Sequence, residues 1–422
     1  MGVILHSQTF DEILRRQVVV DLRDDKNNNM YIQSFSPKAL YACTTQAERR
    51  NSGLNKKDFI EAIGNELGNT IVDGTYNFQI KQEGGLFLNR RRRKDFDYLC
   101  QNLILRKLHN NIKAIYKVQQ ADRNTIVRQM KILLNENVKM WVVRLDVRHF
   151  YESINRERLI NKFTEDGRLS YPSITLLQAL FKEPVVAAGT GMPRGLGVSA
   201  AMSELYMKYF DLAIRRVEGV YYYARFVDDI IVFCSGERSK GLVWETAQDC
   251  LRSLGLELNS EKSYSWCSSA QRTELVYLGY TFKKSDGKVE VSIAGKKIKV
   301  IKTRMTKSFV RFAKDRNFNL LKLRIKFLTG NFTLYQADTL LPIKVGLYFN
   351  YKLATNTECL DELDKYYQKL LHCKTGKLGS RIALTKPELK DLEKYSFRFG
   401  YESHVNHHFT HDQMRMVTNC WL

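Results

Sequence analysis

The chain has few prolines, no closely spaced cysteines and no long apolar run. Its six prolines are scattered over 422 residues, which gives no sign of a flexible linker and favours one compact unit. The eight cysteines include no Cys-x-x-Cys pair, so we expect free thiols in a reducing cytosol and neither a disulfide framework nor a zinc ribbon. No apolar run approaches the roughly 18 residues of a membrane-spanning helix, and the first residues lack the apolar core of a signal peptide. These absences predict a cytoplasmic protein with no membrane partner.

Acidic residues are scarce relative to basic ones. The chain has 67 Lys and Arg against 45 Asp and Glu, a formal net charge of +22 and a pI near 9.5. This charge predicts a polyanionic partner, which nucleic acid or an anionic membrane surface would satisfy. The length is sufficient for two or three subdomains.

An acidic pair interrupts the apolar stretch between Tyr221 and Phe233. Aromatic and β-branched residues on both sides predict two strands, and Val227, Asp228 and Asp229 predict the tight turn between them. Adjacent like charges in an apolar hairpin repel each other, and a divalent cation, which prefers carboxylate oxygens, would offset that repulsion. An ordinary exposed Asp-Asp turn is the alternative.

Two further segments favour the cation. An apolar strand that begins at Trp141 runs into Asp146. Residues 189–207 predict a glycine-rich loop followed by a long helix, which would present backbone N–H groups to a phosphate. Together with the acidic pair, these segments indicate a nucleotidyl-transfer site, in which two cations roughly 3.5–4 Å apart hold the attacking and leaving oxygens.

In their order and spacing these segments resemble the motifs of the reverse transcriptases. The first palm motif matches Asp146 with Phe150 and Tyr151, and the catalytic motif matches Phe226–Asp229. The second, fourth and primer-grip motifs match Met192–Gly195, Leu254–Lys262 and Tyr277–Tyr280. The sequence Pro-Arg-Gly-Leu-Gly-Val-Ser-Ala, which includes the second motif, is most similar to bacterial defence-associated reverse transcriptases, relatives of the retron and abortive-infection enzymes.

The resemblance implies an α+β fold of the right-hand polymerase type. Fingers with an N-terminal extension would occupy residues 1–140, and a catalytic palm of antiparallel sheet and helices would occupy residues 141–285. A basic, mainly helical thumb or C-terminal domain would occupy residues 286–422.

The resemblance also implies an RNA-directed DNA polymerase that extends DNA from dNTPs with two Mg²⁺ ions, or Mn²⁺ in their place. The template would be an associated noncoding RNA, and the biological setting would be antiphage defence. Template-independent or protein-primed DNA synthesis and a non-catalytic RNA-binding scaffold stay open as alternatives. A homo-oligomer and a partner defence protein stay open as well.

The motif matches imply roles for individual residues. Asp146, Asp228 and Asp229 would hold the metal ions and carry catalysis. Lys262 would act as general acid for the leaving pyrophosphate, with a surface lysine as the alternative. Tyr151 would be a steric gate whose ring excludes a 2′-hydroxyl, with a core aromatic residue as the alternative.

Basic residues complete the predicted nucleotide site. Arg194 stands where many reverse transcriptases carry Gln, and its guanidinium suits a triphosphate. Arg123 or Arg128 would clamp the triphosphate from the fingers. In the primer grip, Leu278 and Gly279 would form a tight turn that allows close approach to the primer backbone.

Two clusters of cations predict contacts with nucleic acid, although a solvated basic face would also explain the first of them. One is the densest charge run in the chain, and the other begins an amphipathic helix expected to hold the template–primer duplex. These residues are Arg90, Arg91, Arg92, Arg93, Lys94, Lys296 and Lys297. The histidines between His404 and His411 predict either a metal site or a polar tail that contacts RNA or packs locally.

Overall fold

The protein is described from a computed structural model, which covers residues 31–90, 95–136, 138–268, 274–285, 288–335 and 342–421. The chain divides into two compact units. On the sequence alone, the scattered prolines favour a single compact unit instead. Unit 1 takes its described residues from Met1–Asp122 and Lys139–Ala270. Unit 2 takes its described residues from Arg123–Val138, Gln271–Ala337 and Leu341–Leu422.

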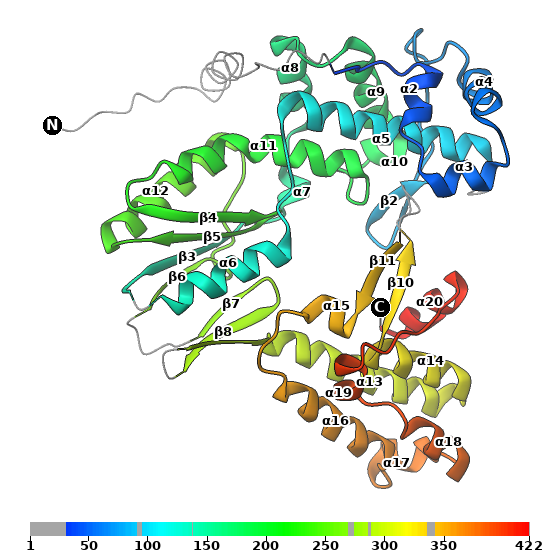
Figure 1. Ribbon diagram of the computed structural model, residues 1–422, viewed down its shortest axis with the longest axis vertical. Coiled ribbons are helices and arrows are strands. Elements are labelled where there is room, and N and C mark those ends of the chain that lie inside the picture. Colours follow the sequence, from blue (N-terminus) through cyan, green and yellow to red (C-terminus); the bar gives the residue numbers. More distant parts are fainter. Residues whose placement is uncertain are drawn as a thin grey trace. The chain divides into compact units, whose positions relative to one another are not determined.

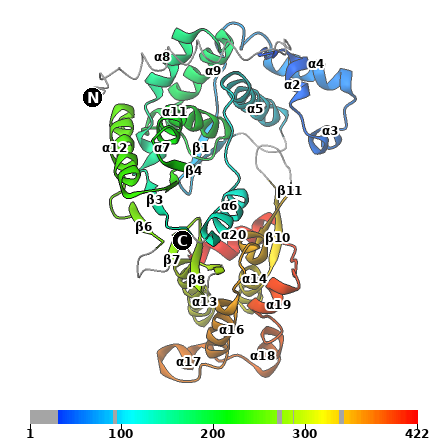
Figure 2. The same cartoon turned by 60° about the vertical axis from the view of Figure 1, so that its left-hand side comes forward.

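Unit 1 combines helices with a four-stranded sheet and a separate hairpin (Figures 1 and 2). Its helices are α2 (Pro37–Ala42), α3 (Gln46–Ser52), α4 (Lys56–Leu67), α5 (Phe96–Tyr116), α7 (Phe150–Ser153), α8 (Arg156–Asp166), α9 (Tyr171–Lys182), α10 (Pro184–Ala187), α11 (Gly197–Arg215) and α12 (Glu237–Leu254). Its strands are β1 (Ile80–Glu83), β2 (Leu86–Asn89), β3 (Trp141–Asp146), β4 (Val220–Phe226), β5 (Asp229–Cys234) and β6 (Tyr264–Cys267).

The four-stranded sheet of unit 1 has the order β4-β5-β3-β6, and all neighbouring strands are antiparallel. In the central strand β3, the side chains of Val142, Val143 and Leu145 are fully buried. Apolar residues on both faces are typical of a strand that is covered on both sides. Helix α11 packs on β4, and α12 packs on β3 and β5 (Figure 1). The predicted strand before Asp146 and the predicted hairpin are therefore both present.

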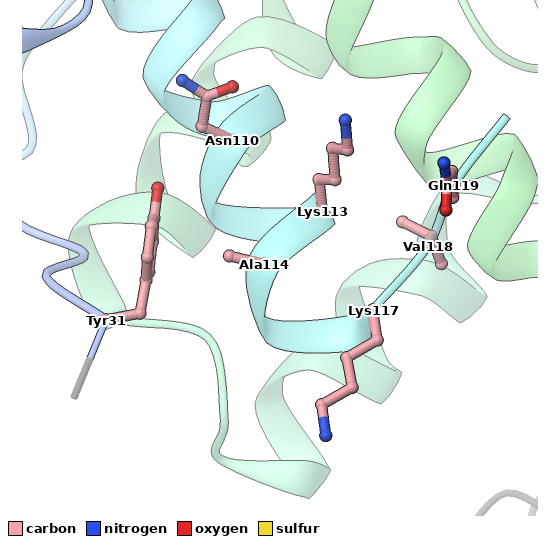
Figure 3. A pocket seen from close by; sticks show the side chains of 7 residues that line it. All are labelled: Tyr31, Asn110, Lys113, Ala114, Lys117, Val118 and Gln119. Atoms are coloured by element: carbon pink, nitrogen blue, oxygen red, sulfur yellow. The ribbon is translucent and has the colours of Figure 1, made fainter. Parts of the chain in front are cut away.

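Helix α5 lies at the centre of the N-terminal part of unit 1. Leu103, Leu108 and Ile112 on this helix are fully buried. A surface pocket of about 500 Å³ opens near its C-terminal end (Figure 3). The residues that line it are Tyr31, Asn110, Lys113, Ala114, Lys117, Val118 and Gln119. Its two lysines, Lys113 and Lys117, lie at the C-terminal end of α5, where the helix dipole favours cations.

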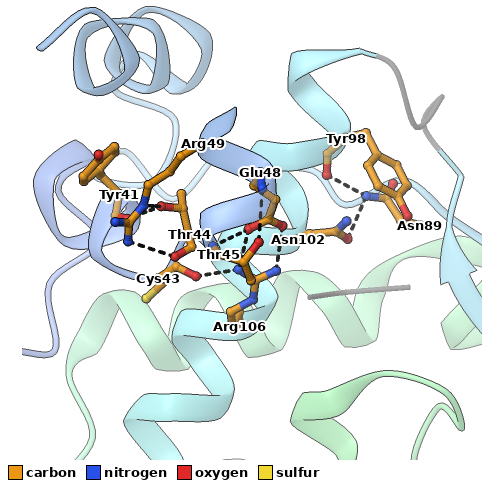
Figure 4. Close-up of polar contacts among 10 residues, drawn as sticks. All are labelled: Tyr41, Cys43, Thr44, Thr45, Glu48, Arg49, Asn89, Tyr98, Asn102 and Arg106. Carbon is orange, nitrogen blue, oxygen red and sulfur yellow. Dashed lines mark hydrogen bonds and ion pairs between the residues drawn. The ribbon is translucent and has the colours of Figure 1, made fainter. Parts of the chain in front are cut away.

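A buried ion pair fixes α3 to α5 (Figure 4). Arg106 on α5 donates two hydrogen bonds to the Glu48 carboxylate, at 2.9 and 3.0 Å, and a third to the Cys43 carbonyl oxygen. Glu48 also accepts from the Thr45 backbone N–H, which completes a capping box at the start of α3. Asn89, at the end of β2, donates two hydrogen bonds to α5. These contacts hold the first helices and the hairpin on one support.

Unit 2 contains a three-stranded antiparallel sheet, a two-stranded hairpin and a helical cluster. Its helices are α6 (Arg123–Asn135), α13 (Gly295–Asp315), α14 (Phe318–Thr329), α15 (Leu347–Tyr351), α16 (Glu358–Leu371), α17 (Gly376–Ile382), α18 (Lys386–Leu392), α19 (Phe397–Glu402), α20 (His411–Thr418) and the 3₁₀ helix η1 (Asn419–Trp421). Its strands are β7 (Glu274–Tyr277), β8 (Tyr280–Ser285), β9 (Lys288–Ile293), β10 (Asn331–Tyr335) and β11 (Pro342–Gly346).

Two helices of unit 2 carry basic residues that the sequence predicts as binding residues, α6 with Arg123 and Arg128 and α13 with Lys296 and Lys297. Helix α6 packs on β8 and β9, where the Asn135 side chain accepts a hydrogen bond of 2.8 Å from the Val289 N–H. Helix α13 buries Met305, Phe309 and Phe312, spaced three or four residues apart, while lysines and arginines occupy positions between them. The predicted basic amphipathic helix is therefore present.

The element content confirms the α+β fold class that the sequence predicts. None of the eight cysteines, all of which the structure describes, forms a disulfide. In the part of the chain that the structure describes, no helix is long and apolar enough to cross a membrane.

Candidate active site

The acidic pair begins on a two-residue hairpin turn between β4 and β5. Phe226 pairs with Asp229 across the ladder, which leaves Val227 and Asp228 as the loop residues. Val227 has a φ of 61°, a left-handed conformation that is unusual for a β-branched side chain and that glycine commonly supplies in such turns. Strain of this kind costs on the order of 1–3 kcal/mol and persists where the surroundings hold it. The turn therefore presents Asp228 from a constrained backbone.

Strand register brings the three predicted carboxylates to one end of the sheet. Asp146, the last residue of β3, is the direct partner of Asp229, the first residue of β5. The Asp228 carbonyl oxygen accepts a hydrogen bond of 3.4 Å from the Val147 N–H. Asp146 is almost completely buried, whereas Asp229 is partly exposed. The predicted catalytic trio thus occupies neighbouring backbone positions.

Two cations lie against these carboxylates. The Lys262 Nζ is 3.1 and 3.2 Å from the two carboxylate oxygens of Asp146. Arg144 donates from Nη2 to Asp229 Oδ1 at 3.1 Å. The pKa of Asp228 is raised, first by burial and further by the charges of Asp229 and Asp146. A bound cation would therefore stabilise the charged form of Asp228.

The carboxylate trio has the donor chemistry that Mg²⁺ or Mn²⁺ requires, because hard cations take oxygen ligands. Within the described residues, no group of three or more His, Cys, Asp or Glu side chains is arranged to hold a metal ion. Two of the three carboxylates face Lys262 and Arg144 instead. The three carboxylates thus have the right ligand atoms for a divalent cation. For the metal to bind, it would have to displace Lys262 from Asp146 and Arg144 from Asp229.

The glycine-rich loop packs directly against α7. The Met192 N–H donates to the Tyr151 carbonyl oxygen at 2.7 Å. Gly191 has a φ of 66°, and a Cβ there would lie 2.0 Å from that oxygen and 2.4 Å from the Glu152 backbone. Only glycine allows this approach. Arg156 adds a hydrogen bond to the Gly191 carbonyl oxygen, so backbone contacts set the position of the loop against Tyr151.

Tyr151, Glu152 and Arg194 form a polar cluster at this loop. The Arg194 guanidinium lies 5.4 Å from the centroid of the Tyr151 ring, a cation–π distance, and pairs with the Glu152 carboxylate at 2.8 Å. About half of each charged side chain is exposed, 48% for Arg194 and 45% for Glu152. Although partial burial opposes it, the hydrogen bond from Arg194 lowers the pKa of Glu152. Burial raises the pKa of Tyr151, and the neighbouring Ser203 hydroxyl partly opposes this rise.

The predicted primer-grip turn lies in unit 2. Tyr277 of β7 pairs with Tyr280 of β8, so Leu278 and Gly279 form a two-residue loop. Both have positive φ, 46° and 80°, which is the pattern of a type I′ hairpin turn. The Lys297 side chain adjoins this loop, because a Cβ at Gly279 would lie 3.6 Å from Lys297 Cε. Unit 2 thus brings the predicted primer grip together with one predicted nucleic-acid contact.

Arg123, predicted to contact a triphosphate, supports this turn instead. Its Nε and Nη2 donate to the Leu278 carbonyl oxygen at 3.1 and 2.6 Å, and its Nη1 donates to the Asn350 carbonyl oxygen at 2.8 Å. The guanidinium also lies 4.8 Å from the centroid of the Tyr280 ring. The Arg123 guanidinium is thus bound to carbonyl oxygens of unit 2. A contact between Arg123 and a nucleotide stays a prediction.

The other predicted basic contacts lie on different elements of the two units. Arg128 is exposed on α6, and Lys296 is exposed in the first turn of α13. Arg90 follows β2, and its N–H donates to the Gln79 carbonyl oxygen at 2.8 Å. The remaining predicted contacts, Arg91, Arg92, Arg93 and Lys94, lie outside the described residues.

The C-terminal histidines have aromatic surroundings. His404 stacks on Tyr348 with ring centroids 3.7 Å apart. Burial lowers the pKa of His407, whose ring lies 6.4 Å from that of Phe409. The side chain of His411 lies outside the described residues. These contacts agree with the prediction that the segment packs locally, whereas a metal site and an RNA contact stay predictions.

Sequence reasoning overlooked three charged residues near the site, Arg144, Glu152 and Arg225. Arg144 and Arg225 interrupt the apolar strands β3 and β4. A charge inside an apolar strand signals a buried partner, and this signal was available in the sequence. Glu152 offers no comparable signal, because an acidic residue in a short helix is ordinary.

Comparison with known families gives the class of this region. Residues 95–282, just under half of the chain, match the family model described as reverse transcriptase (RNA-dependent DNA polymerase). The matched segment includes the three carboxylates, the glycine-rich loop and the primer-grip turn. The matched residues are therefore similar to reverse transcriptases, as the motif order predicts. Domains of this class use divalent metal ions.

Relatives outside this family match are distant. No curated protein matches the chain. A C-terminally truncated apo telomerase from Candida tropicalis is 16% identical, with a TM-score of 0.38 over 52% of this chain and 55% of that one. Telomerase from Candida albicans, in complex with a fragment of telomeric RNA, is 13% identical, with a TM-score of 0.34 over 75% and 56%. The BmCPV RNA-dependent RNA polymerase is 10% identical, with a TM-score of 0.43 over 76% and 30%.

The chain thus spans between 30% and 56% of the length of these three structures. Similarity at this level carries no argument about activity.

Proposed function

We propose that the protein is a reverse transcriptase that extends DNA from dNTPs on an RNA template, with divalent metal ions, Mg²⁺ or Mn²⁺, at Asp146, Asp228 and Asp229. The observation that carries this proposal is the register of β3 and β5, which pairs Asp146 with Asp229 and leaves Asp228 on the adjoining turn. When bound, two such metals would activate the primer 3′-hydroxyl and neutralise charge on the transferred phosphate.

The nucleotide would lie against the Tyr151 ring. Tyr151 is fixed through its backbone by Met192, and the Arg194 guanidinium lies against its ring. A ring held in this way would exclude a 2′-hydroxyl and so select dNTPs. Arg194 would exchange its partner Glu152 for the triphosphate, since a phosphate offers more charge to a guanidinium than one carboxylate does.

Lys262 would act twice, first as the partner of Asp146 before a metal binds and then as a proton donor to the leaving pyrophosphate. It neutralises Asp146 before a metal binds, and its side chain is half exposed. Once released from Asp146, the ammonium group would be free to protonate the leaving pyrophosphate. The nucleic acid would be held by the Leu278–Gly279 turn and by the basic face of α13, including Lys296 and Lys297.

The biological setting rests on the resemblance of the Pro-Arg-Gly segment to defence-associated reverse transcriptases. We propose a noncoding RNA as the template, cDNA as the product and antiphage defence as the role. A homo-oligomer or a partner defence protein would fit the same setting. The proposed cytoplasmic location is supported by the eight described cysteines, which are thiols and form no disulfide.

The deciding experiment uses protein purified with its bound RNA. Labelled dNTPs and Mg²⁺ are supplied to the wild type and to the Asp228→Ala/Asp229→Ala variant, before and after ribonuclease treatment. We expect incorporation that requires the RNA and falls at least about 10³-fold in the variant. The matched control is Asp249→Ala, an exposed aspartate on α12, which should retain full incorporation.

The other outcomes identify the alternatives. Product that survives removal of RNA and migrates with the protein would establish untemplated, protein-primed synthesis. Absence of incorporation by folded wild-type protein that still binds RNA would establish a scaffold.

A further inference from the structure

Arg225 is a buried charge next to the catalytic turn. It lies on β4, two residues before Val227, and its side chain is only 4% exposed. A guanidinium at this depth is stable only with carboxylate and hydrogen-bond partners around it. Its partners therefore show what the residue holds together.

Every N–H of the Arg225 guanidinium has an acceptor. Nε donates to Asp211 Oδ1 at 2.7 Å, and Nη2 donates to Asp211 Oδ2 and to Glu204 Oε2, each at 2.7 Å. Nη1 donates to Glu204 Oε1 at 3.3 Å and to the Val227 carbonyl oxygen at 3.1 Å. Both carboxylates belong to α11. A lysine, with three donors on a flexible stem, would leave some of these acceptors unpaired.

The contact with Val227 links α11 to the catalytic turn. Val227 is the strained residue of that turn, with a φ of 61°, and Asp228 follows it directly. Holding the Val227 carbonyl oxygen fixes the peptide plane between Val227 and Asp228, because the peptide bond is planar. The direction of the Asp228 side chain then depends on this hydrogen bond.

We propose that Arg225 is a positioning residue of the polymerase site, which locks the Val227–Asp228 turn onto α11 and thereby sets the place of the Asp228 carboxylate. This inference rests on the proposed function. The lock is itself supported, since the Tyr223 hydroxyl donates to Asp211 Oδ1 at 2.5 Å.

The same helix also contacts the nucleotide side of the site. Ser203, adjacent to Glu204 on α11, is a neighbour of the Tyr151 hydroxyl. Helix α11 begins at Gly197, immediately after the loop that contains Arg194. Arg225 therefore joins the turn that carries Asp228 to a helix that also borders Tyr151 and Arg194.

The test compares the wild type with Arg225→Lys, which keeps the charge but loses the fork of donors. We expect kcat to fall about 10²-fold, the effect of a displacement near 1 Å at a reacting centre. The KM for dNTP and the Kd for template–primer should change less than about twofold. Amide hydrogen exchange of residues 227–230 should accelerate, which reports the lock without any reference to activity.

The matched control is Arg106→Lys. Arg106 is a similarly buried arginine, 11% exposed, that forks onto Glu48 and also holds a backbone carbonyl, in the N-terminal helices. It should lose thermal stability to a similar degree with kcat unchanged. If Arg225→Lys does not fold, Asp211→Asn replaces it, with the same pattern expected at smaller amplitude.

Two results would overturn the proposal. One is an unchanged kcat and unchanged exchange in Arg225→Lys. The other is a loss of kcat in both lysine variants that merely follows the loss of folded protein. If wild-type protein shows no polymerase activity, the exchange comparison still decides whether Arg225 holds the turn, so the two failures are distinguishable.

Discussion

Gly191 and Val227 occupy similar backbone conformations in two loops of unit 1, with φ values of 66° and 61°. Glycine adopts this conformation without strain, and Gly191 also needs its missing side chain to approach Tyr151. Valine adopts it only under constraint, which the hydrogen bond from Arg225 provides. Val227, which precedes Asp228, is thus held in a backbone conformation that valine disfavours.

Val227→Gly tests this constraint. We expect a gain of about 1 kcal/mol in the free energy of unfolding, because relief of roughly 1–3 kcal/mol of strain exceeds the entropic cost of glycine. We expect kcat to fall, because a freer turn fixes Asp228 less well. Urea unfolding and steady-state kinetics measure the two effects. Val276→Gly, in the strand β7, is the control and should lose stability; a loss of stability in Val227→Gly would contradict the strain.

Tyr151→Val tests the steric gate. Removing the ring should lower the preference for dNTPs over NTPs by about 10²-fold, since discrimination of a hydroxyl by shape is worth a few kcal/mol. The ratio of kcat/KM for dGTP and GTP measures it. Tyr151→Phe keeps the ring and should keep the preference. Equal selectivity in all three proteins would mean that Tyr151 is only a core residue.

At the scale of elements, α6 acts as a brace for the primer-grip turn. Arg123 at its first position holds the Leu278 carbonyl oxygen, and Asn135 at its last position holds the Val289 N–H. Both ends of one helix are thus tied to the three-stranded sheet of unit 2. The turn is also two residues long with positive φ at both, so its backbone has little freedom.

Arg123→Lys tests the brace. A lysine cannot make the paired contact with the Leu278 carbonyl oxygen and the further contact with Asn350, so the turn should loosen. We expect template–primer Kd to rise about 10-fold with dNTP KM nearly constant. Fluorescence anisotropy and steady-state kinetics separate the two. Arg128→Lys, exposed on the same helix, should behave as wild type. A selective rise in the KM for dNTP in Arg123→Lys would instead support the predicted triphosphate clamp.

Sequence reasoning succeeded at this scale where the signal was local. The strand before Asp146 and the hairpin around Asp228 follow from runs of apolar and β-branched residues, so periodicity predicts them. The partners of Arg123 and Lys262 lie 155 and 116 residues away, and no local pattern specifies them. The left-handed conformation of Val227 could not be predicted either, because glycine is the usual residue at such a position.

For the whole molecule, the net charge of +22 sets how the protein meets a polyanion. Lysines and arginines on α13 alternate with its buried positions, so much of one element is a cationic surface. Contacts of this kind release counterions and depend steeply on salt. They supply affinity and position without reading the base sequence.

Affinity for template–primer should therefore fall about 10³-fold between 50 and 200 mM salt, a dependence typical of six or more phosphate contacts. In Lys296→Glu/Lys297→Glu the slope of log Kd against log salt should decrease by about two. Anisotropy titrations in KCl give both values. The control is Lys386→Glu/Lys390→Glu on α18, and an equal change in its slope would show that only net charge matters.

The pairing of Asp146 with Asp229 has a consequence for how this protein can evolve. Side chains alternate between the two faces of a strand, so a register shift of one residue would turn a carboxylate to the opposite face. Point substitutions within β3 or β5 change packing but leave that alternation intact. Insertion or deletion of a single codon in either strand breaks it. In a library of variants selected for activity, positions of these two strands other than Asp146 and Asp229 should accept apolar substitutions, whereas neither strand should accept a change of length.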